Sequence, residues 1–141
     1  MVIKILKLMV AVLKLFESDT STLSTVFSYF NKLIQQIGEI SWNFIDNIQK
    51  LIKKRWEYSY HPIMMVTYIL DPRFLEESRN GNIEATGYNE FTAFTNKCFD
   101  QKKSAKLFIE LVKFCQKVSS YDNETIWISS SGLSPYIWWE S

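Results

Sequence analysis

Apolar residues recur every three or four positions along most of the chain, which is the period of an amphipathic α-helix. In residues 2–17, Lys4, Lys7 and Lys14 fall on one stripe that faces solvent. The rest of the circumference is largely apolar, so this helix should pack against more than one neighbour. We expect its inward face to comprise Ile5, Leu8, Met9, Val12, Leu15 and Phe16.

Residues 22–54 carry the longest regular apolar stripe, and they predict one long helix of roughly 50 Å at about 1.5 Å per residue. The short polar side chains at 18–21 form a break and a helix cap before it. Gly38 lies inside the stripe, where it marks either a bend or a close helix contact. The stripe comprises Leu23, Val26, Phe27, Phe30, Ile34, Ile37, Ser41, Phe44, Ile45, Ile48 and Ile52.

A short buried helix over 63–70 follows, because Pro62 suits a first helical turn and the Asp71-Pro72 pair disfavours its continuation. Its inward positions should be Ile63, Val66, Ile69 and Leu70.

The remaining pattern predicts two further helices, at 88–100 and 104–118, after a polar segment at 76–86 that holds an Asn-Gly-Asn turn signal. Residues 119–134 read as irregular, with a short strand at 125–128. A last helix begins at Ser134 or Pro135. Strand patterns are otherwise nearly absent, so the fold class is all-α, and 1–141 should form a single helical region.

Composition narrows the function classes. Hydrophobic residues make up 47% of the chain, too many for a disordered protein. Sixteen basic residues oppose fifteen acidic ones, so no overall field concentrates the chain on nucleic acid. No apolar run approaches the roughly 18 residues of a membrane span, and no signal peptide is evident, which indicates a soluble intracellular protein without a membrane partner.

Candidate catalytic or ligand groups are few. Cys98 and Cys115, with His61 as the single histidine, cannot complete a four-ligand zinc site, and both thiols should be buried. His61 is either a lone base or ligand, or a cap before Pro62, and we favour the cap. Asp71 is either a metal carboxylate or a turn residue that caps local N–H groups, and we favour the turn. We expect no cofactor and no small-molecule ligand.

Three pieces of the sequence, taken together, resemble the hAT superfamily of DNA transposases. The first runs from Arg55-Trp56 through His61-Pro62 to Leu70-Asp71-Pro72-Arg73-Phe74. The second is the pair of helices before it. The third is Ser134-Pro135-Tyr136-Ile137-Trp138-Trp139, which is similar to the start of the family's C-terminal dimerisation region.

The resemblance implies the helical part of an RNase H-like transposase, a nuclear protein whose catalysis uses three carboxylates and two divalent metals. None of these carboxylates has a counterpart here, and the family's BED-type zinc finger is missing. We therefore expect a non-catalytic fragment: long helices and the His-Pro motif at 1–75, a helical pair at 86–118, and a truncated dimerisation region at 134–141. The motif residues Trp56, His61, Pro62, Leu70, Asp71, Pro72 and Phe74 should be structural.

The resemblance also suggests partners. Trp138 and Trp139 are the dimer-interface candidates, because tryptophan is enriched in interface hot spots. A local basic patch near aromatic residues can contact phosphates weakly, or can simply close a helix end. The expected function is architecture and self-association with copies of this chain or related transposases. The alternatives are a free-standing helical interaction module or a membrane-surface protein using the basic first helix. The patch comprises Lys50, Lys53, Lys54 and Arg55.

Overall fold

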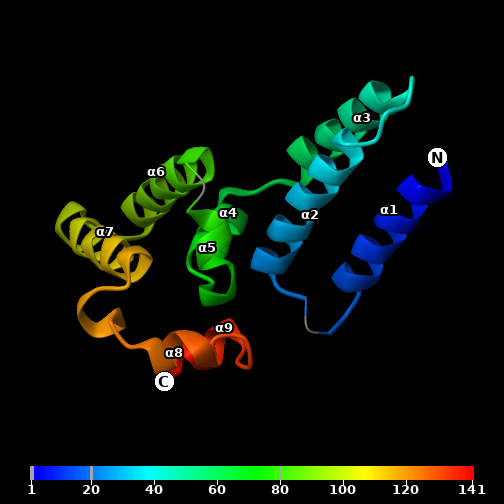
Figure 1. Cartoon of the computed structure of the whole chain (residues 1–141). Helices are drawn as coiled ribbons and strands as arrows, with labels where there is room; N and C mark the ends of the chain where they lie inside the picture. The colour runs from blue at the N-terminus through cyan, green and yellow to red at the C-terminus, as the bar shows by residue number, and fades with distance from the viewer. Residues whose placement is uncertain (1, 20, 80) are drawn as a thin grey trace. The chain divides into compact units, whose positions relative to one another are not determined.

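The computed structural model describes residues 2–19, 21–79 and 81–141, and every regular element in those ranges is helical (Figure 1). The predicted all-α fold class is therefore confirmed. Its membership of an RNase H-like transposase stays a prediction. The α-helices are α1 (Val2–Phe16), α2 (Leu23–Gly38), α3 (Ile45–Ser59), α4 (Pro62–Ile69), α5 (Leu75–Ser78), α6 (Gly81–Cys98), α7 (Gln101–Gln116), α8 (Glu124–Ser129) and α9 (Pro135–Glu140), and the 3₁₀ helices are η1 (Pro72–Phe74) and η2 (Ser119–Tyr121).

The chain forms two compact units, Met1–Met64 and Met65–Ser141. In the first unit, α2 packs against both α1 and α3. The helix predicted at 2–17 is confirmed as α1. The core of this unit is built almost wholly from β-branched aliphatic side chains, which come from all three helices and from the loop after α2: Ile5, Leu33, Ile37, Ile40, Ile45 and Ile52.

The single long helix predicted for 22–54 is wrong. Helix α2 ends at Gly38, where the backbone N–H of Glu39 donates to the carbonyl of Gln35 at 3.2 Å and the N–H of Ile40 donates to the carbonyl of Ile37 at 3.1 Å. Helix α3 then packs against α2, because a hairpin buries Ile45 and Ile52 in the same core as Ile37. A straight helix would have carried Ile45 and Ile52 away from it. The predicted stripe is not buried throughout, since Leu23, Ser41 and Phe44 are exposed.

Gly38 stands where α2 and α3 approach each other closely. A Cβ added there would lie 2.6 Å from the side-chain nitrogen of Gln49 on α3. That nitrogen also donates to the carbonyl of Ile34 across 3.5 Å. The close contact considered from the sequence is therefore present, at the end of a helix rather than within one.

The second unit places α6 against α7, α5 against α6, and α9 against η1. The short helix predicted at 63–70 is confirmed as α4, whose residues span the boundary between the two units at 64/65. Residues Met64, Met65, Val66, Tyr68 and Ile69 are buried, whereas Ile63 and Leu70 are half-buried.

Three further expectations for this unit are corrected. The strand at 125–128 is helix α8, because Asn123 Oδ1 accepts from the N–H of Thr125 at 3.0 Å and starts a helical turn. The polar segment at 76–86 is largely helical, since α6 already begins at Gly81; the turn signal's first residue, Asn80, lies outside the described residues. Cys98 is exposed rather than buried, near the end of α6, while Cys115 is buried as expected.

Among the described residues, no helix combines the length and apolar character required to cross a membrane.

Candidate functional site

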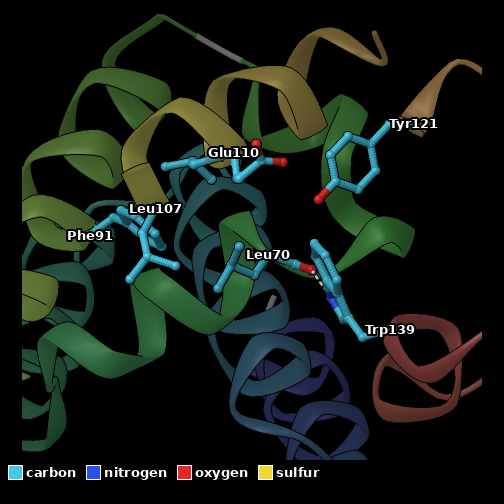
Figure 2. A pocket seen from close by; sticks show the side chains of 7 residues that line it. Leu70, Phe91, Leu107, Glu110, Tyr121 and Trp139 are labelled. Atoms are coloured by element: carbon cyan, nitrogen blue, oxygen red, sulfur yellow. Dashed lines mark hydrogen bonds between the residues drawn. The ribbon is translucent and has the colours of Figure 1, made fainter. Parts of the chain in front are cut away.

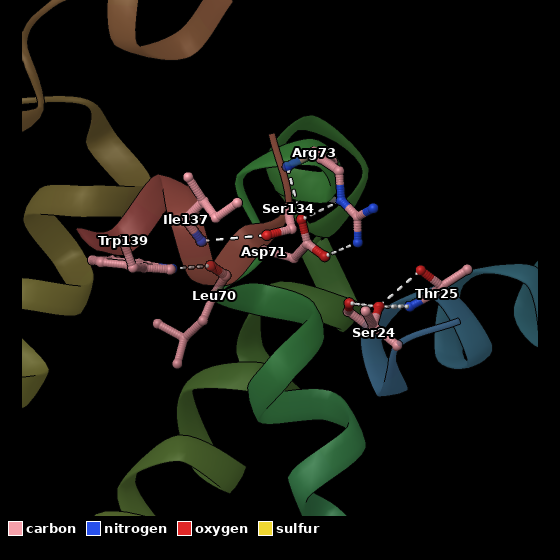
Figure 3. Close-up of polar contacts among 9 residues, drawn as sticks. Ser24, Thr25, Leu70, Asp71, Arg73, Ser134, Ile137 and Trp139 are labelled. Atoms are coloured by element: carbon pink, nitrogen blue, oxygen red, sulfur yellow. Dashed lines mark hydrogen bonds and ion pairs between the residues drawn. The ribbon is translucent and has the colours of Figure 1, made fainter. Parts of the chain in front are cut away.

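Two distant segments of the second unit meet where α9 lies against η1. Ser134 caps α9 by accepting from the N–H of Ile137 at 3.3 Å, and Pro135 occupies the first turn. This places the Trp139 indole so that its Nε1 donates to the carbonyl of Leu70 at 2.9 Å, 69 positions away (Figure 3). The predicted motif segments at 70–74 and 134–139 are thus brought together.

Asp71 holds the turn at this junction. Its carboxylate is 1% exposed and accepts from the backbone N–H of Arg73 at 3.0 Å. The Arg73 guanidinium also binds both carboxylate oxygens, at 3.0 and 2.7 Å (Figure 3). A two-point contact of this kind fixes the orientation of the Asp71 carboxylate and also balances its charge. The predicted turn-capping role of Asp71 is confirmed.

Phe114 is the centre of an aromatic cluster in this unit. Its ring is completely buried and lies 5.0–5.8 Å from four other ring centres, which belong to Tyr121, Trp127, Trp138 and Trp139. The indole N–H groups of Trp127 and Trp138 are both satisfied, by the carbonyls of Tyr121 at 2.7 Å and Ile126 at 2.9 Å. The cluster anchors both short C-terminal helices to α7.

The two candidate interface tryptophans differ sharply in accessibility. Trp138 is 4% exposed and belongs to the core, whereas Trp139 is 42% exposed. Only Trp139 can contact a partner without local opening of the fold. The dimer-interface role of the pair stays a prediction.

A cavity of about 390 Å³ adjoins Trp139 (Figure 2). Most of its wall is aliphatic or aromatic, and its two polar side chains are Glu110 and Tyr121. Burial raises the pKa of the Tyr121 phenol, and the negative charge of Glu110 raises it further, while Lys113 acts in the opposite direction. The lining residues are Leu70, Phe91, Leu107, Glu110, Leu111, Tyr121 and Trp139.

The His-Pro motif, His61-Pro62, forms the start of helix α4. His61 is exposed, its Nδ1 accepts from the N–H of Ile63 at 3.3 Å, and its carbonyl accepts from the N–H of Met64 at 2.8 Å. The predicted capping role is therefore confirmed. Trp56, just before the motif, stacks on Phe30 of α2 with ring centres 4.2 Å apart.

The other motif residues have similar surroundings. Pro62, Leu70 and Phe74 are half-buried, and Pro72 is buried. The Phe74 ring stacks on Tyr68, with centres 5.6 Å apart.

The basic patch of Lys50, Lys53, Lys54 and Arg55 is exposed along α3. Within the described ranges, none of the four forms an ion pair. Lys50, Lys53 and Lys54 share one face, because residues three and four apart are neighbours on a helix. Their charges are free to meet phosphates, although DNA contact stays a prediction.

Helix α1 exposes an apolar face, and the prediction that Met9 faces inward is wrong, because this side chain belongs to the exposed face. Six of its side chains remain between 39% and 69% exposed: Val2, Ile3, Leu6, Met9, Val10 and Leu13. Beside them, a groove of about 290 Å³ runs between α1 and α3. The breadth of the apolar face was visible in the sequence, but the number of neighbours available to cover it was not. The groove is lined by Val2, Ile5, Leu6, Met9, Trp42, Ile48, Leu51 and Ile52.

Across the described part of the chain, no three His, Cys, Asp or Glu side chains are grouped so that they could hold a metal ion. Comparison with protein-family models, with curated proteins and with solved structures found no match.

Proposed function

We propose that this chain is a non-catalytic helical module that self-associates through α1. The observation that carries the proposal is the unpartnered apolar face of that helix. Monomeric proteins rarely expose contiguous apolar patches above a few hundred Å² unless the patch is a binding surface. The role matches the architectural function implied by the resemblance to hAT transposases.

The geometry of the face supports pairing with a second copy. Ile3, Leu6, Val10 and Leu13 recur at intervals of three and four, so they form a ridge along the exposed side of the helix. The groove between α1 and α3 lies directly beside this ridge, and Leu6 belongs to both. A surface that carries a ridge and an adjacent groove can pair with itself about a two-fold axis, ridge into groove.

Sedimentation equilibrium of the full chain tests this proposal. We expect a dimer at micromolar concentration, and a monomer for the double variant Leu6→Glu/Val10→Glu, because charges at the centre of an apolar interface lose their hydration. Lys4→Glu is the matched control, since Lys4 is an exposed residue of the same helix outside the ridge. Unchanged helical circular dichroism would show that each variant folds. A monomeric wild-type chain at about 100 µM would refute self-association.

A second role, weak DNA contact, is supported by the exposed basic patch on α3. Fluorescence anisotropy with a labelled DNA duplex at several salt concentrations measures it. Converting Lys50, Lys53 and Lys54 to Gln should weaken binding and lower the salt dependence by up to about three counterions. The matched control converts Lys102, Lys103 and Lys106 of α7, which are also exposed, and should leave binding unchanged.

The proposed relationship to hAT transposases is tested on the DNA that flanks the coding sequence. Remnants encoding Asp-bearing strands upstream and a Ser-Glu-Arg-like motif downstream in the flanking DNA would support it. Their absence would favour a free-standing interaction module. Under the transposase proposal the protein is nuclear, and the purified chain should neither nick nor join supercoiled plasmid with Mg²⁺ present.

A further inference from the structure

We propose that the cavity beside Trp139 binds a small organic ammonium ion, held by the Tyr121 and Trp139 rings and by the Glu110 carboxylate. This site lies in the second unit and is independent of the α1 surface.

Two aromatic rings form a corner at the cavity. The ring centres of Tyr121 and Trp139 are 6.1 Å apart and their planes meet at 75°. An ammonium beside such a pair would contact a negative ring face, which is how proteins recognise quaternary and methylated ammonium groups. Both rings line the cavity (Figure 2).

The corner is held in place before any ligand arrives. The Trp139 indole N–H is fixed on the Leu70 carbonyl at 2.9 Å, and the buried Phe114 ring supports it with centres 5.0 Å apart. Tyr121 is likewise packed on Phe114, at 5.6 Å. A preorganised site loses little conformational freedom on binding, so a small ligand can be held by few contacts.

Glu110 supplies the complementary charge. Its side chain reaches the same cavity from α7, and its charge acts on the Tyr121 phenol. One carboxylate oxygen pairs with the Lys113 ammonium at 2.7 Å. Lys113 does not line the cavity, so a ligand cation would share the carboxylate with Lys113 or displace it.

The aliphatic part of the cavity wall determines which group can be attached to the ammonium. Leu70, Leu107 and Leu111 are aliphatic, so they favour an alkyl chain next to the ammonium. The volume of about 390 Å³ lies at the lower end of the range for small-molecule sites, about 300–1,000 Å³. The ammonium can belong to a free amine or to a methylated lysine side chain.

Two-dimensional NMR of the full chain provides the test. The probe is choline, compared with its uncharged carbon isostere 3,3-dimethylbutan-1-ol at concentrations up to about 10 mM, enough to occupy a site with a Kd of about 1 mM. We expect choline to shift the Trp139 indole N–H resonance saturably, and the isostere to bind about tenfold more weakly. A peptide with trimethyllysine forms the second arm, and the tighter of the two ligands identifies the source of the ammonium.

Variants separate charge recognition from simple apolar binding. Glu110→Gln should weaken choline binding about five- to tenfold, whereas Lys113→Met should strengthen it, because the carboxylate is then free of its partner. Glu124→Gln, an exposed carboxylate outside the cavity, is the matched control and should change nothing. Equal binding of choline and its isostere, an unaffected Glu110→Gln variant, or no shift with either ammonium ligand would overturn the proposal.

Discussion

Gly87 of α6 offers a sharp test of the packing in the second unit. It is a buried helical glycine, and a Cβ added there would lie 2.6 Å from Cγ2 of Ile69 on α4 and 3.4 Å from its Cδ1. Carbon atoms in contact normally keep about 3.5–4.0 Å apart. Gly87→Ala therefore forces either α6 or Ile69 to move.

The change in the free energy of unfolding caused by Gly87→Ala is the sum of two opposing contributions. Alanine within a helix is favoured over glycine by about 1 kcal/mol. Overpacking a core by one methyl group costs about 1–3 kcal/mol. Ile69 is only 2% exposed, and a β-branched side chain on a helix has essentially one rotamer, so it cannot swing aside. The cost of the steric clash should exceed the gain in helix propensity, for a net destabilisation of about 1 kcal/mol.

Urea unfolding followed by circular dichroism measures this difference. Gly81→Ala is the matched control, because Gly81 begins the same helix and its added Cβ meets nothing within 4 Å. That variant should be neutral or slightly stabilised. In an Ile69→Ala background, the cost of Gly87→Ala should largely disappear, which a double-mutant cycle detects. If Gly87→Ala stabilises the wild-type chain as much as Gly81→Ala does, the close approach of α4 and α6 is not real.

Three further predictions follow from local geometry. Asp71→Asn should destabilise the chain by about 2 kcal/mol in urea unfolding, because it weakens charge-assisted bonds at a buried site, and a neutral result would contradict the structural role of the carboxylate. Ser119 has φ 63°, so Ser119→Gly should stabilise by about 1 kcal/mol while Ser120→Gly next to it should not, as thermal unfolding would show. The Lys117 contact lowers the pKa of Glu76 below its unfolded value. The contact therefore stabilises the folded chain above about pH 4.3, and this stabilisation is lost as the pH falls through the folded pKa. Glu76→Gln should reduce the loss of unfolding free energy at acid pH, and an unchanged pH dependence would refute the contact.

The sequence predicted most helices of this fold because their signals are local. Lys4, Lys7 and Lys14 mark a solvent stripe on α1, and the prolines at 62 and 72 bound α4 through their missing N–H groups and fixed φ. The cap at Asp71 and the helix start at Ser134 or Pro135 were predictable for the same reason, since donor and acceptor lie within three residues of each other at both places.

Periodicity alone could not distinguish one long helix from a hairpin. The apolar interval is the same on both sides of Gly38, and only the tertiary core decides that α2 should stop and α3 fold back. The strand expected at 125–128 failed for a related reason. Its β-favouring side chains, Thr125, Ile126, Trp127 and Ile128, are overruled by the Asn123 cap and by the Trp127 bond to Tyr121.

The candidate site depends on contacts that no local pattern encodes. The Trp-Trp pair and the Leu-Asp-Pro segment are each recognisable in the sequence, but no local pattern predicts that the Trp139 indole donates to the Leu70 carbonyl. Glu110 carried no motif at all, and it becomes significant only because Tyr121 and Trp139 are brought beside it across the aromatic cluster. Because Trp139 both closes this junction and lines the cavity, its replacement should disturb ligand binding and local stability together. Glu110 and Lys113 are therefore the better positions at which to separate binding from folding: both are partly exposed, neither belongs to the aromatic cluster around Phe114, and the binding proposal requires their substitutions to act in opposite directions.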